Sequence, residues 1–542
     1  MYSNIKPMKN QDIKYWVFLL LLLVFFVMAE PGFSQSIEII QKQSPVLTFK
    51  EGNTVLTLEV NAGKTRTDVR EINLDLTGTS DLNDLENVRI YYHGEKQQNS
   101  IQFGETMSPS NSMSFRDMVS LASGTGIFSI VVKLRDDADI LHSMVVRVKQ
   151  LITADGTILP DIKYKPLTLR FGTALRQHMQ DGVHTYRIPG IVRTNNGTLL
   201  AIFDRRLEAR RDPQGWINIG LIRSTDGGKT WEPDRIVLDR GYWGGLHPRY
   251  NGVSDANILV NRENNHIYVG ALWMHGQWID GVWEGEPGDP NAELGRKTGS
   301  MPGMTERETS QFLLTKSTDD GKTWSVPVNM TKIKKPEWPL YAPAPTNGIT
   351  LDDGTLVFPS KVPGNVALTY SKDGGQTWTV SHLGPRTAGV ENAIVQLEDG
   401  SIMLNARRKQ GSSYRTVYTT PDLGKTWIEH PTSGKVLADP GCLGSLYKHV
   451  YYLNGQKKSI LFFSNPNSKE RRERMTIRAS FDEGMTWPEE NWILLDEGRS
   501  AYSSITSVDN QTIGILYEVR EPGSDGVSLT FQKLSISEFT KK

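Results

Sequence analysis

The sequence predicts an all-β protein whose larger part is a propeller or an array of repeated sheets. An eight-residue motif occurs five times, as STDGGKTW from Ser224, STDDGKTW from Ser317, SKDGGQTW from Ser371, TPDLGKTW from Thr420 and SFDEGMTW from Ser480. The last four copies start 49 to 60 residues apart, a spacing typical of propellers and arrays. The 49 glycines and 13 tryptophans, without long leucine-rich periodic stretches, favour many short strands joined by turns.

Each octet has the composition of a tight hairpin turn. We expect its aspartate to accept hydrogen bonds from backbone amides one or two residues further on. The glycine two positions after the aspartate supplies the positive φ of such a turn. The final Thr-Trp is expected to start the next strand and to bury its ring between neighbouring sheets. These aspartates are Asp226, Asp319, Asp373, Asp422 and Asp482.

The octet resembles the Asp-box of six-bladed β-propellers, above all those of the sialidases (neuraminidases). The resemblance implies that residues 171–542 form a six-bladed sialidase β-propeller. Residues 36–165 contain no octet but alternate in short β-like runs separated by turn signals, which predicts an N-terminal β-sandwich of jelly-roll-like form. Carbohydrate binding and simple packing against the propeller are its two candidate roles.

Composition and the N-terminus limit the class of protein further. Lys+Arg and Asp+Glu both number 61, so the chain has no overall basic field for nucleic acid. Cys442 is the one cysteine, which rules out an intramolecular disulfide. Three lysines precede an apolar run at residues 16–29 that is shorter than the roughly twenty residues of a spanning helix. We therefore predict a signal peptide at 1–35 and an exported protein, periplasmic or extracellular, with an uncleaved membrane anchor as the alternative.

The longest gap between octets, from Glu232 to Lys316, exceeds one repeat. It holds either an octet-free blade or a large insertion. The segment is rich in glycine and tryptophan, and its rings either rim a sugar site or form a small aromatic core of their own. The aromatic residues concerned are Tyr242, Trp243, Trp273, Trp278 and Trp283.

The segment Tyr186-Arg187-Ile188-Pro189 resembles the Phe/Tyr-Arg-Ile-Pro signature of sialidases. An arginine beside proline and between apolar neighbours is expected to be held rigidly, as a residue that grips a ligand carboxylate must be. Asp204-Arg205-Arg206 matches the Asp-x-Arg that the family places on the following strand. Asp212, six residues past Arg206, matches its acid/base aspartate, with Glu208 as the rival acid.

The family resemblance extends to two further segments in the middle of the chain. Asp255 matches the substrate-contacting aspartate, and a turn-forming aspartate is the alternative. Alternation places Glu391 on one face with aliphatic residues, so it needs a partner. The resemblance makes Glu391 the base for a tyrosine and Arg407 the second clamp arginine, with Arg408 in reserve and Glu398 interpreted as solvated.

The remaining candidates lie near the C-terminus. Four arginines crowd one stretch, namely Arg471, Arg472, Arg474 and Arg478. The family pattern has apolar residues three and five positions past the third clamp arginine, which selects Arg472, with Arg474 second. Tyr502, followed by serine, matches the nucleophilic tyrosine. Glu518, in Gly-Ile-Leu-Tyr-Glu, matches the glutamate that braces the first arginine.

Together these residues imply a retaining exo-α-sialidase. Arg187, Arg407 and Arg472 would hold the substrate carboxylate. A neutral tyrosine would attack the already anionic centre with less repulsion than a carboxylate would. The implied substrates are sialylated glycoproteins, glycolipids or oligosaccharides, and the protein is expected to be a monomer. No metal or organic cofactor is implied. A trans-sialidase, an anhydro-forming enzyme and a non-catalytic sialoglycan-binding propeller are the alternatives.

Overall fold

The computed structural model describes residues 35–540 except 62–65, 95–99, 123–124, 162, 213–214, 280–281, 285–300, 387–390 and 408–411. Of residues 277–284 only the backbone of two short strands is described. The predicted signal peptide, apart from Gln35, and the reserve candidate Arg408 therefore lie outside the described residues. The helices that the structure describes are all too short or too polar to cross a membrane.

The described residues form many β-strands joined by turns and loops, with almost no helix, as the sequence predicts. Their one α-helix is the four-residue α3 (Ser537–Thr540). Single-turn 3₁₀ helices occur in several loops: η1 (Leu82–Asp84), η2 (Gln180–Gly182), η3 (Pro248–Tyr250), η4 (Thr331–Ile333) and η5 (Glu489–Asn491).

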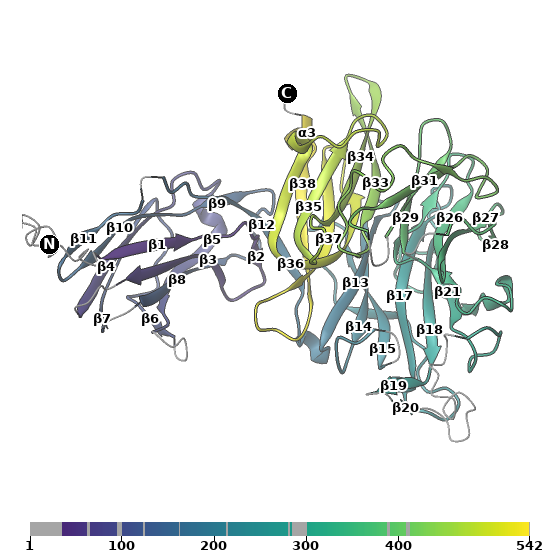
Figure 1. The fold of residues 1–542 in the computed structure, drawn as a ribbon, viewed down its shortest axis with the longest axis horizontal. Helices are drawn as coiled ribbons and strands as arrows, with labels where there is room; N and C mark the ends of the chain where they lie inside the picture. Colours follow the sequence, from purple (N-terminus) through teal and green to yellow (C-terminus); the bar gives the residue numbers. More distant parts are fainter. Residues whose placement is uncertain are drawn as a thin grey trace, which may run out of the picture.

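The N-terminal part consists of two antiparallel sheets with strand orders β1-β3-β8-β5-β6 and β11-β10-β4-β7 (Figure 1). Alternation in β8 buries Phe128, Ile130 and Val132, which share one hydrophobic core with Ile72 and Leu74 of the other sheet. The strands are β1 (Ser36–Ile40), β3 (Asn53–Asn61), β4 (Thr67–Asp75), β5 (Leu85–Tyr92), β6 (Ile101–Gln102), β7 (Ser112–Leu121), β8 (Thr125–Leu134), β10 (Arg147–Thr153) and β11 (Gly156–Ile158).

The larger part begins with four separate sheets. The first contains β13 (Thr185–Arg193), β14 (Leu199–Arg206), β15 (Ile217–Ser224) and β16 (Arg235–Leu238). The second contains β17 (Asn251–Val260), β18 (Ile267–His275), β21 (Gln311–Ser317), β22 (Val328–Asn329) and β24 (Thr346–Asn347). The third contains β23 (Ala342–Pro343), β25 (Ile349–Thr350), β26 (Leu356–Val362), β27 (Asn365–Ser371) and β28 (Thr379–Val380). The fourth contains β29 (Asn392–Gln396), β30 (Ile402–Ala406), β31 (Thr416–Thr420) and β32 (Ile428–Glu429).

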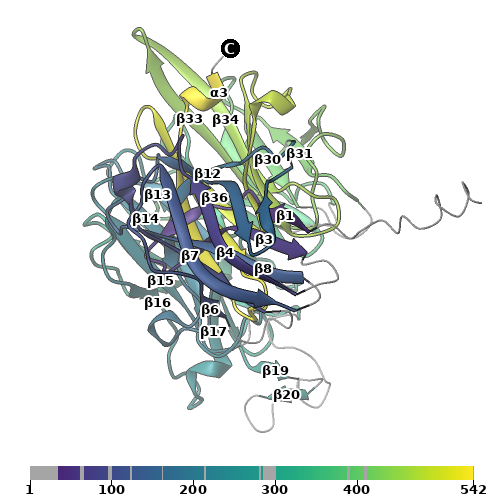
Figure 2. The same cartoon turned by 90° about the vertical axis from the view of Figure 1, so that its left-hand side faces the viewer.

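A nine-stranded sheet completes the larger part and ties it to the N-terminal sheets. Its long strand β36 pairs with β35 through its first half and with β37 through its second half. The early strand β12 pairs with the late β38, and β2 joins β12 in parallel (Figure 1). In Figure 2 the strands of the N-terminal sheets lie in front of the larger part. The strands are β2 (Val46–Thr48), β9 (Ser143–Val145), β12 (Thr168–Arg176), β33 (Ser445–Leu453), β34 (Gln456–Pro466), β35 (Glu473–Ser480), β36 (Trp492–Ser507), β37 (Thr512–Arg520) and β38 (Ser528–Ser535).

One strand from each of the four separate sheets and two strands of the nine-stranded sheet form a closed series of contacts. β13 contacts β17, β17 contacts β26, β26 contacts β29, β29 contacts β33, β33 contacts β36, and β36 contacts β13. Residues far apart in the sequence are therefore brought to a common centre. The candidate site residues come from several of these strands.

The five octets are turns that connect two adjacent strands of one sheet. In the Ser371 copy, Ser371 Oγ donates to Asp373 at 2.7 Å and accepts from the Gly375 amide at 2.8 Å. The Thr377 amide donates to the Asp373 carboxylate at 2.9 Å. The other four copies repeat these contacts. The glycine two positions past each aspartate has φ between 79° and 90°, which confirms the predicted positive φ.

Two details of the predicted turn are wrong. The aspartates accept from amides three and four residues on, such as Gln376 and Thr377, because the loop curls around the carboxylate. The next strand starts directly after Trp378 and Trp427, but only four or five residues after the other three octet tryptophans. The rings nevertheless pack on the sheet cores, as expected.

Replacing Asp319 by alanine is expected to destabilise the protein by about 1–2 kcal/mol, because amides of its turn lose their acceptor. Burial raises the pKa of Asp319, but hydrogen bonds from Thr323 and Ser317 outweigh it and lower the pKa from 3.8 to about 2. The wild type therefore loses this contribution as pH falls from about 4 to about 2, and the variant does not. Thermal unfolding at pH 7 and pH 3 measures both effects. Asp352→Asn, at an exposed turn aspartate, is the control and should change neither.

The long gap between octets contains a large insertion, the second of the two predicted alternatives. After β18 the chain forms the hairpin of β19 (Gln277–Ile279) and β20 (Val282–Glu284) before β21 leads into the Ser317 octet. Trp243 packs on the buried Trp273 at 5.1 Å between ring centroids, so these two rings form a local aromatic core. Tyr242 is 73% exposed. The side chains of Trp278 and Trp283 lie outside the described residues.

Candidate active site

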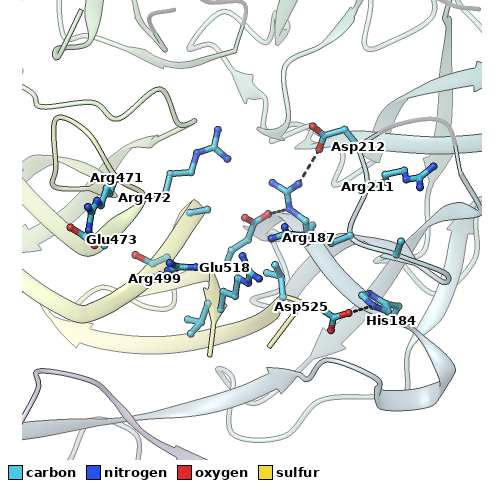
Figure 3. Close-up of a pocket in the computed structure, with 17 residues that line it drawn as sticks. His184, Arg187, Arg211, Asp212, Arg471, Arg472, Glu473, Arg499, Glu518 and Asp525 are labelled. Atoms are coloured by element: carbon cyan, nitrogen blue, oxygen red, sulfur yellow. Dashed lines mark hydrogen bonds and ion pairs between the residues drawn. The ribbon is translucent and has the colours of Figure 1, made fainter. Parts of the chain in front are cut away.

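Several predicted site residues line a cavity of about 940 Å³ beside the N-terminal end of β13 (Figure 3). Arg187, Asp212, Arg472 and Glu518 are among its walls. Octet residues do not contribute to it. The octets thus help to build the sheets, and other segments supply the site chemistry.

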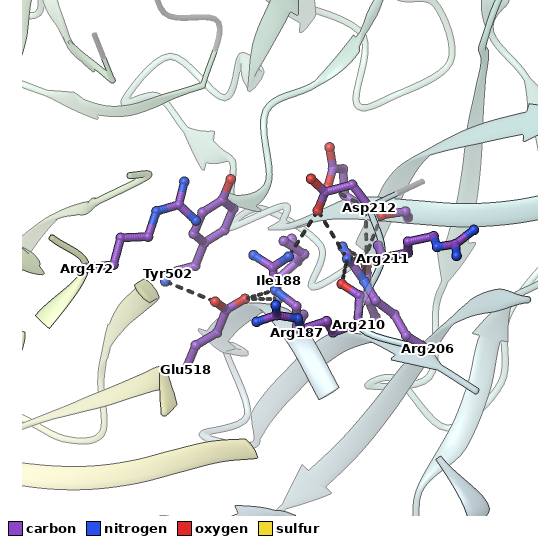
Figure 4. A network of polar contacts seen from close by, with 12 residues as sticks. Arg187, Ile188, Arg206, Arg210, Arg211, Asp212, Arg472, Tyr502 and Glu518 are labelled. Carbon is purple, nitrogen blue, oxygen red and sulfur yellow. Dashed lines mark hydrogen bonds and ion pairs between the residues drawn. The ribbon is translucent and has the colours of Figure 1, made fainter. Parts of the chain in front are cut away.

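Arg187 is held by a distorted stretch of β13. The pairing of β13 with β14 shifts register between Arg187 and Gly190, and Ile188 has φ 55°, which is strained for a β-branched residue. The buried Glu518 of β37 accepts from Arg187 Nε at 3.1 Å and from the Ile188 amide at 2.8 Å (Figure 4). One carboxylate therefore fixes both the bulge and the arginine.

Asp212 reaches the same guanidinium from a loop. Its Oδ1 lies 3.0 Å from Arg187 Nη1 and 3.2 Å from Arg206 Nη1, while its side chain is 80% exposed. The surrounding protein raises the pKa of Asp212, but Arg206 and Arg187 together lower it more, so the net pKa is below the ordinary value. The carboxyl is thus ionised as long as both arginines contact it.

The rival acid Glu208 does not contact these arginines; it pairs with Arg249 at 2.5 Å. Arg205, between the two motif residues, points to the other face of β14 and pairs with Asp234 at 2.8 Å. The alternation of the strand accounts for this separation of Arg205 from Arg206.

Arg206 and Asp255 belong to a buried network behind Asp212. Asp204 accepts from Arg206 Nη2 at 3.0 Å, from Ser254 Oγ at 2.6 Å and from the Asp255 amide at 3.1 Å. Lys361 of β26 donates to Asp255 at 2.5 Å. Burial raises the pKa of Asp255, but Lys361 outweighs it and the net pKa is lowered. Asp255 is therefore a charged, fixed group with φ 58°.

Tyr502, Glu391 and Arg407 form a second group. Tyr502 Oη donates to Glu391 Oε1 at 2.6 Å, and Arg407 Nη1 lies 3.0 Å from the same hydroxyl while pairing with the other Glu391 oxygen. Burial and the Glu391 carboxylate raise the pKa of Tyr502 well above its ordinary value, although Arg407 and Arg472 oppose them. The phenol is therefore neutral and already bonded to a base.

Of the four crowded arginines, Arg472 faces Tyr502. Its guanidinium carbon lies 5.7 Å from the Tyr502 ring centroid, and its Nη2 donates to the Gly441 carbonyl at 2.8 Å. Arg474 is exposed and lies 3.5 Å from Glu497. Arg471 is exposed. Arg478 is fully buried on the Trp492 ring. Arg474 has φ 64°, and the pairing of β35 with β36 shifts register on either side of Met475, so strict alternation does not hold along this segment.

Sequence reasoning missed two residues of this region. Lys361 is buried with every other residue of β26, and a lysine in a largely apolar run is a signal that could have identified it. Cys442 is buried in one small cluster with Ile188 and Tyr502, a neighbourhood that no sequence pattern indicates.

Two family models and several known proteins match this chain. Residues 188–518 match the family model "BNR repeat-like domain", and residues 34–157 match "N-terminal domain of BNR-repeat neuraminidase". The Sialidase of Bacteroides fragilis is 34% identical, over 98% of this chain and 100% of that protein. The Sialidase of Clostridium perfringens is 28% identical, over 61% of this chain and 86% of that protein.

A solved structure shares the architecture as well. Hadza microbial sialidase Hz136 superimposes with a TM-score of 0.82 at 32% identity, over 92% of this chain and 99% of that one. The match includes the N-terminal sheets as well as the larger part, because it extends over nearly the full length of both chains. The chain belongs to the BNR-repeat neuraminidases, the bacterial sialidases, and is a glycoside hydrolase of the exo-α-sialidase type.

Proposed function

We propose that this sialidase releases terminal sialic acids with retention of anomeric configuration, with Tyr502 as nucleophile, Glu391 as its base and Asp212 as acid/base. The observation that carries the proposal is the 2.6 Å hydrogen bond from Tyr502 to Glu391, set among three arginines. A tyrosine paired with a buried carboxylate at an anion-binding position has the components of an activated neutral nucleophile.

The arginines surround the Tyr502 ring from three directions. The guanidinium carbons of Arg187 and Arg472 lie 5.5 and 5.7 Å from its centroid, and Arg407 contacts its hydroxyl. Sialic acid carries its carboxylate on the anomeric carbon, so a carboxylate held by these groups places that carbon next to the phenol oxygen. Arg206 and Asp255 would contact the sugar from the Asp212 side.

The reaction proceeds in two displacements. Tyr502 Oη bonds to the anomeric carbon as its proton passes to Glu391, and the glycosidic oxygen leaves with the proton of Asp212. Asp212 then takes a proton from water, which attacks the same carbon, and the phenol regains its proton from Glu391. Each displacement inverts the centre, so the net result is retention.

Arg187 connects substrate binding to the protonation of Asp212. In the free protein Asp212 occupies Arg187 Nη1, the position that the substrate carboxylate would take. Binding would replace this contact and place a second anion near Asp212, and both changes raise the pKa of its carboxyl. Asp212 would thereby become a proton donor only when substrate is present.

The fold proposal rests on the ring of strand contacts. Six strands in a closed series of contacts, with β33 and β36 taken as the inner strands of two blades within the nine-stranded sheet, are consistent with a six-bladed β-propeller at residues 171–542, preceded by a sandwich at 36–165. We propose a monomer that is exported after removal of residues 1–35, and that acts on sialylated glycoproteins, glycolipids or oligosaccharides. Glycan binding is the proposed role of the sandwich.

Turnover of natural and fluorogenic sialosides tests this function. Proton NMR of the first-formed product distinguishes retention from inversion, and product analysis with excess lactose or without acceptor detects trans-sialylation or an anhydro sugar. Release of β-sialic acid as the first product, or absence of turnover on every sialoside, would contradict the proposal.

Asp212→Asn is expected to lower kcat/KM for natural sialosides by about 10²–10⁴-fold, because their leaving groups need a proton. Aryl sialosides with acidic leaving groups should lose much less. Glu208→Gln is the matched control, since Glu208 is an exposed acid of the same loop that pairs with Arg249. Equal losses on both substrate classes would exclude Asp212 as the acid.

A further inference from the structure

A histidine–aspartate cluster lies beside the candidate active site. His178 and His184 flank η2, and Asp525 lies in the connection between β37 and β38. His184 and Asp525 line the same cavity as Arg187. Figure 3 shows the contact between His184 and Asp525. No step of the proposed reaction uses these three residues.

The possible ligand atoms of the three residues lie close together. His178 Nε2 lies 3.3 Å from Asp525 Oδ1, and His184 Nε2 lies 3.4 Å from Asp525 Oδ2. The three potential ligand atoms all lie within 4.8 Å of one another. Ligand atoms around a tetrahedral zinc ion with bonds of about 2.0–2.1 Å are about 3.3–3.4 Å apart. Each imidazole is already at this distance from one of the two Asp525 oxygens, so a single carboxylate oxygen has only to turn between the two rings to complete the ligand set.

Both Nδ1 atoms are hydrogen-bonded outside the cluster, and for His178 this bond fixes which nitrogen carries the proton. His178 Nδ1 is hydrogen-bonded to the His184 carbonyl, which can only accept, so the proton is on Nδ1 and a neutral ring has its lone pair on Nε2. His184 Nδ1 is bonded to Thr185 Oγ1 at 2.9 Å. A lone pair aimed at a carboxylate is unfavourable unless a proton or a metal cation lies between them.

We propose that His178, His184 and Asp525 bind a borderline divalent metal ion, Zn²⁺, through the two Nε2 atoms and the carboxylate. The Asp525 side chain is 79% exposed, so solvent can supply the fourth ligand. The His184 carbonyl and Thr185 hydroxyl would orient the imidazoles from behind, as partners of metal-bound histidines do. The ion would tie the β37–β38 connection to the start of β13.

The ligand atoms select the class of metal. Seven arginines and four acidic residues line the cavity, so its net charge favours no divalent cation, and binding has to come from the imidazole nitrogens and the carboxylate. Ca²⁺ and Mg²⁺ prefer oxygen ligands, whereas imidazole nitrogens favour zinc and neighbouring transition metals. The cluster should therefore bind Zn²⁺ or Co²⁺ and not Ca²⁺ or Mg²⁺.

Calorimetric titration of tag-free, chelator-treated full-length protein with Zn²⁺ tests the site. One Zn²⁺ per chain is expected, Co²⁺ should give the visible absorption of a four-coordinate complex, and Ca²⁺ should give no binding. Asp525→Asn and His178→Gln should each weaken Zn²⁺ binding by at least about tenfold. His382→Gln, at an exposed histidine outside the cluster, is the control and should bind as the wild type does.

Two results would overturn the proposal. One is Zn²⁺ binding that Asp525→Asn and His178→Gln leave unchanged. The other is no binding at pH 7.5 with both imidazoles protonated by NMR, which would make the cluster an ion pair. Metal stoichiometry does not depend on sialoside turnover, so failure here is distinguishable from failure of the proposed hydrolase mechanism. Circular dichroism and sialoside turnover of each variant confirm that it is folded.

Discussion

Tyr502→Phe is expected to reduce kcat on sialosides by at least about a thousandfold, the order of loss seen when a covalent nucleophile is removed. The substitution deletes one oxygen and leaves the ring beneath Arg187 and Arg472 in place. Binding of the substrate carboxylate should therefore persist, and KM or the inhibition constant of free sialic acid should change little. The split between kcat and binding identifies a loss at the reacting atom.

Tyr517→Phe is the matched control for this experiment. Tyr517 is equally buried, pairs with Ser503 across β36 and β37, and its hydroxyl donates to Gln532 at 3.1 Å. Its loss should affect stability and leave kcat within a few fold. A Tyr502→Phe enzyme with near-normal kcat, or a control that loses as much, would remove Tyr502 from the role of nucleophile.

The all-β class and the octet turns could be predicted from the sequence because both depend on local chemistry. A serine, an aspartate and a glycine at fixed spacing are sufficient to close the loop seen at Ser371. The pattern does not specify which amides the carboxylate reaches, since that depends on how tightly the loop curls. Hence the sequence predicts the turn, but the amides that bond the aspartate lie two residues further on than expected.

The sequence predicts only those site residues that lie in motifs resembling the motifs of sialidases. Asp212, Glu391 and Tyr502 all come from such motifs, and they remain predictions in their catalytic roles. Lys361 was missed because its partner Asp255 lies in another sheet, and pairing between sheets has no local sequence signal. The choice among four arginines has no local sequence signal either, because Arg472 is placed against Tyr502 by contact of its segment with β36, where the Ser500 amide donates to the Arg472 carbonyl.

Distorted strands recur at the site. β13, β17 and β36 shift register at Arg187–Gly190, Ser254–Asn257 and Ser500–Ser503. A bulge breaks strict alternation and re-aims one side chain without ending the strand. In a regular strand without a bulge, successive side chains point to opposite faces of the sheet. The bulges allow neighbouring strands to direct polar groups to one centre, and the buried Glu518 stabilises the bulge of β13.

Arg187→Lys is expected to lower kcat/KM by roughly a hundredfold, about 3 kcal/mol, within the range for breaking a buried hydrogen-bonded ion pair. The guanidinium donates from Nε to Glu518 and from Nη1 to Asp212. The substrate carboxylate would replace Asp212 at Nη1. An ammonium is a single point and cannot bridge both positions with the same geometry. Glu518, 2% exposed, would then lose its fixed partner, so thermal stability should fall as well.

Arg205→Lys is the control for Arg187→Lys, because Arg205 is also a partly buried arginine paired with an aspartate, but on the opposite face of β14. It should alter stability and leave kcat/KM nearly unchanged. The inhibition constant of free sialic acid should rise for Arg187→Lys and stay constant for Arg205→Lys. If Arg187→Lys kept the wild-type inhibition constant, Arg187 would brace Glu518 without holding the substrate, and the carboxylate clamp would have to be formed by Arg407 and Arg472 alone.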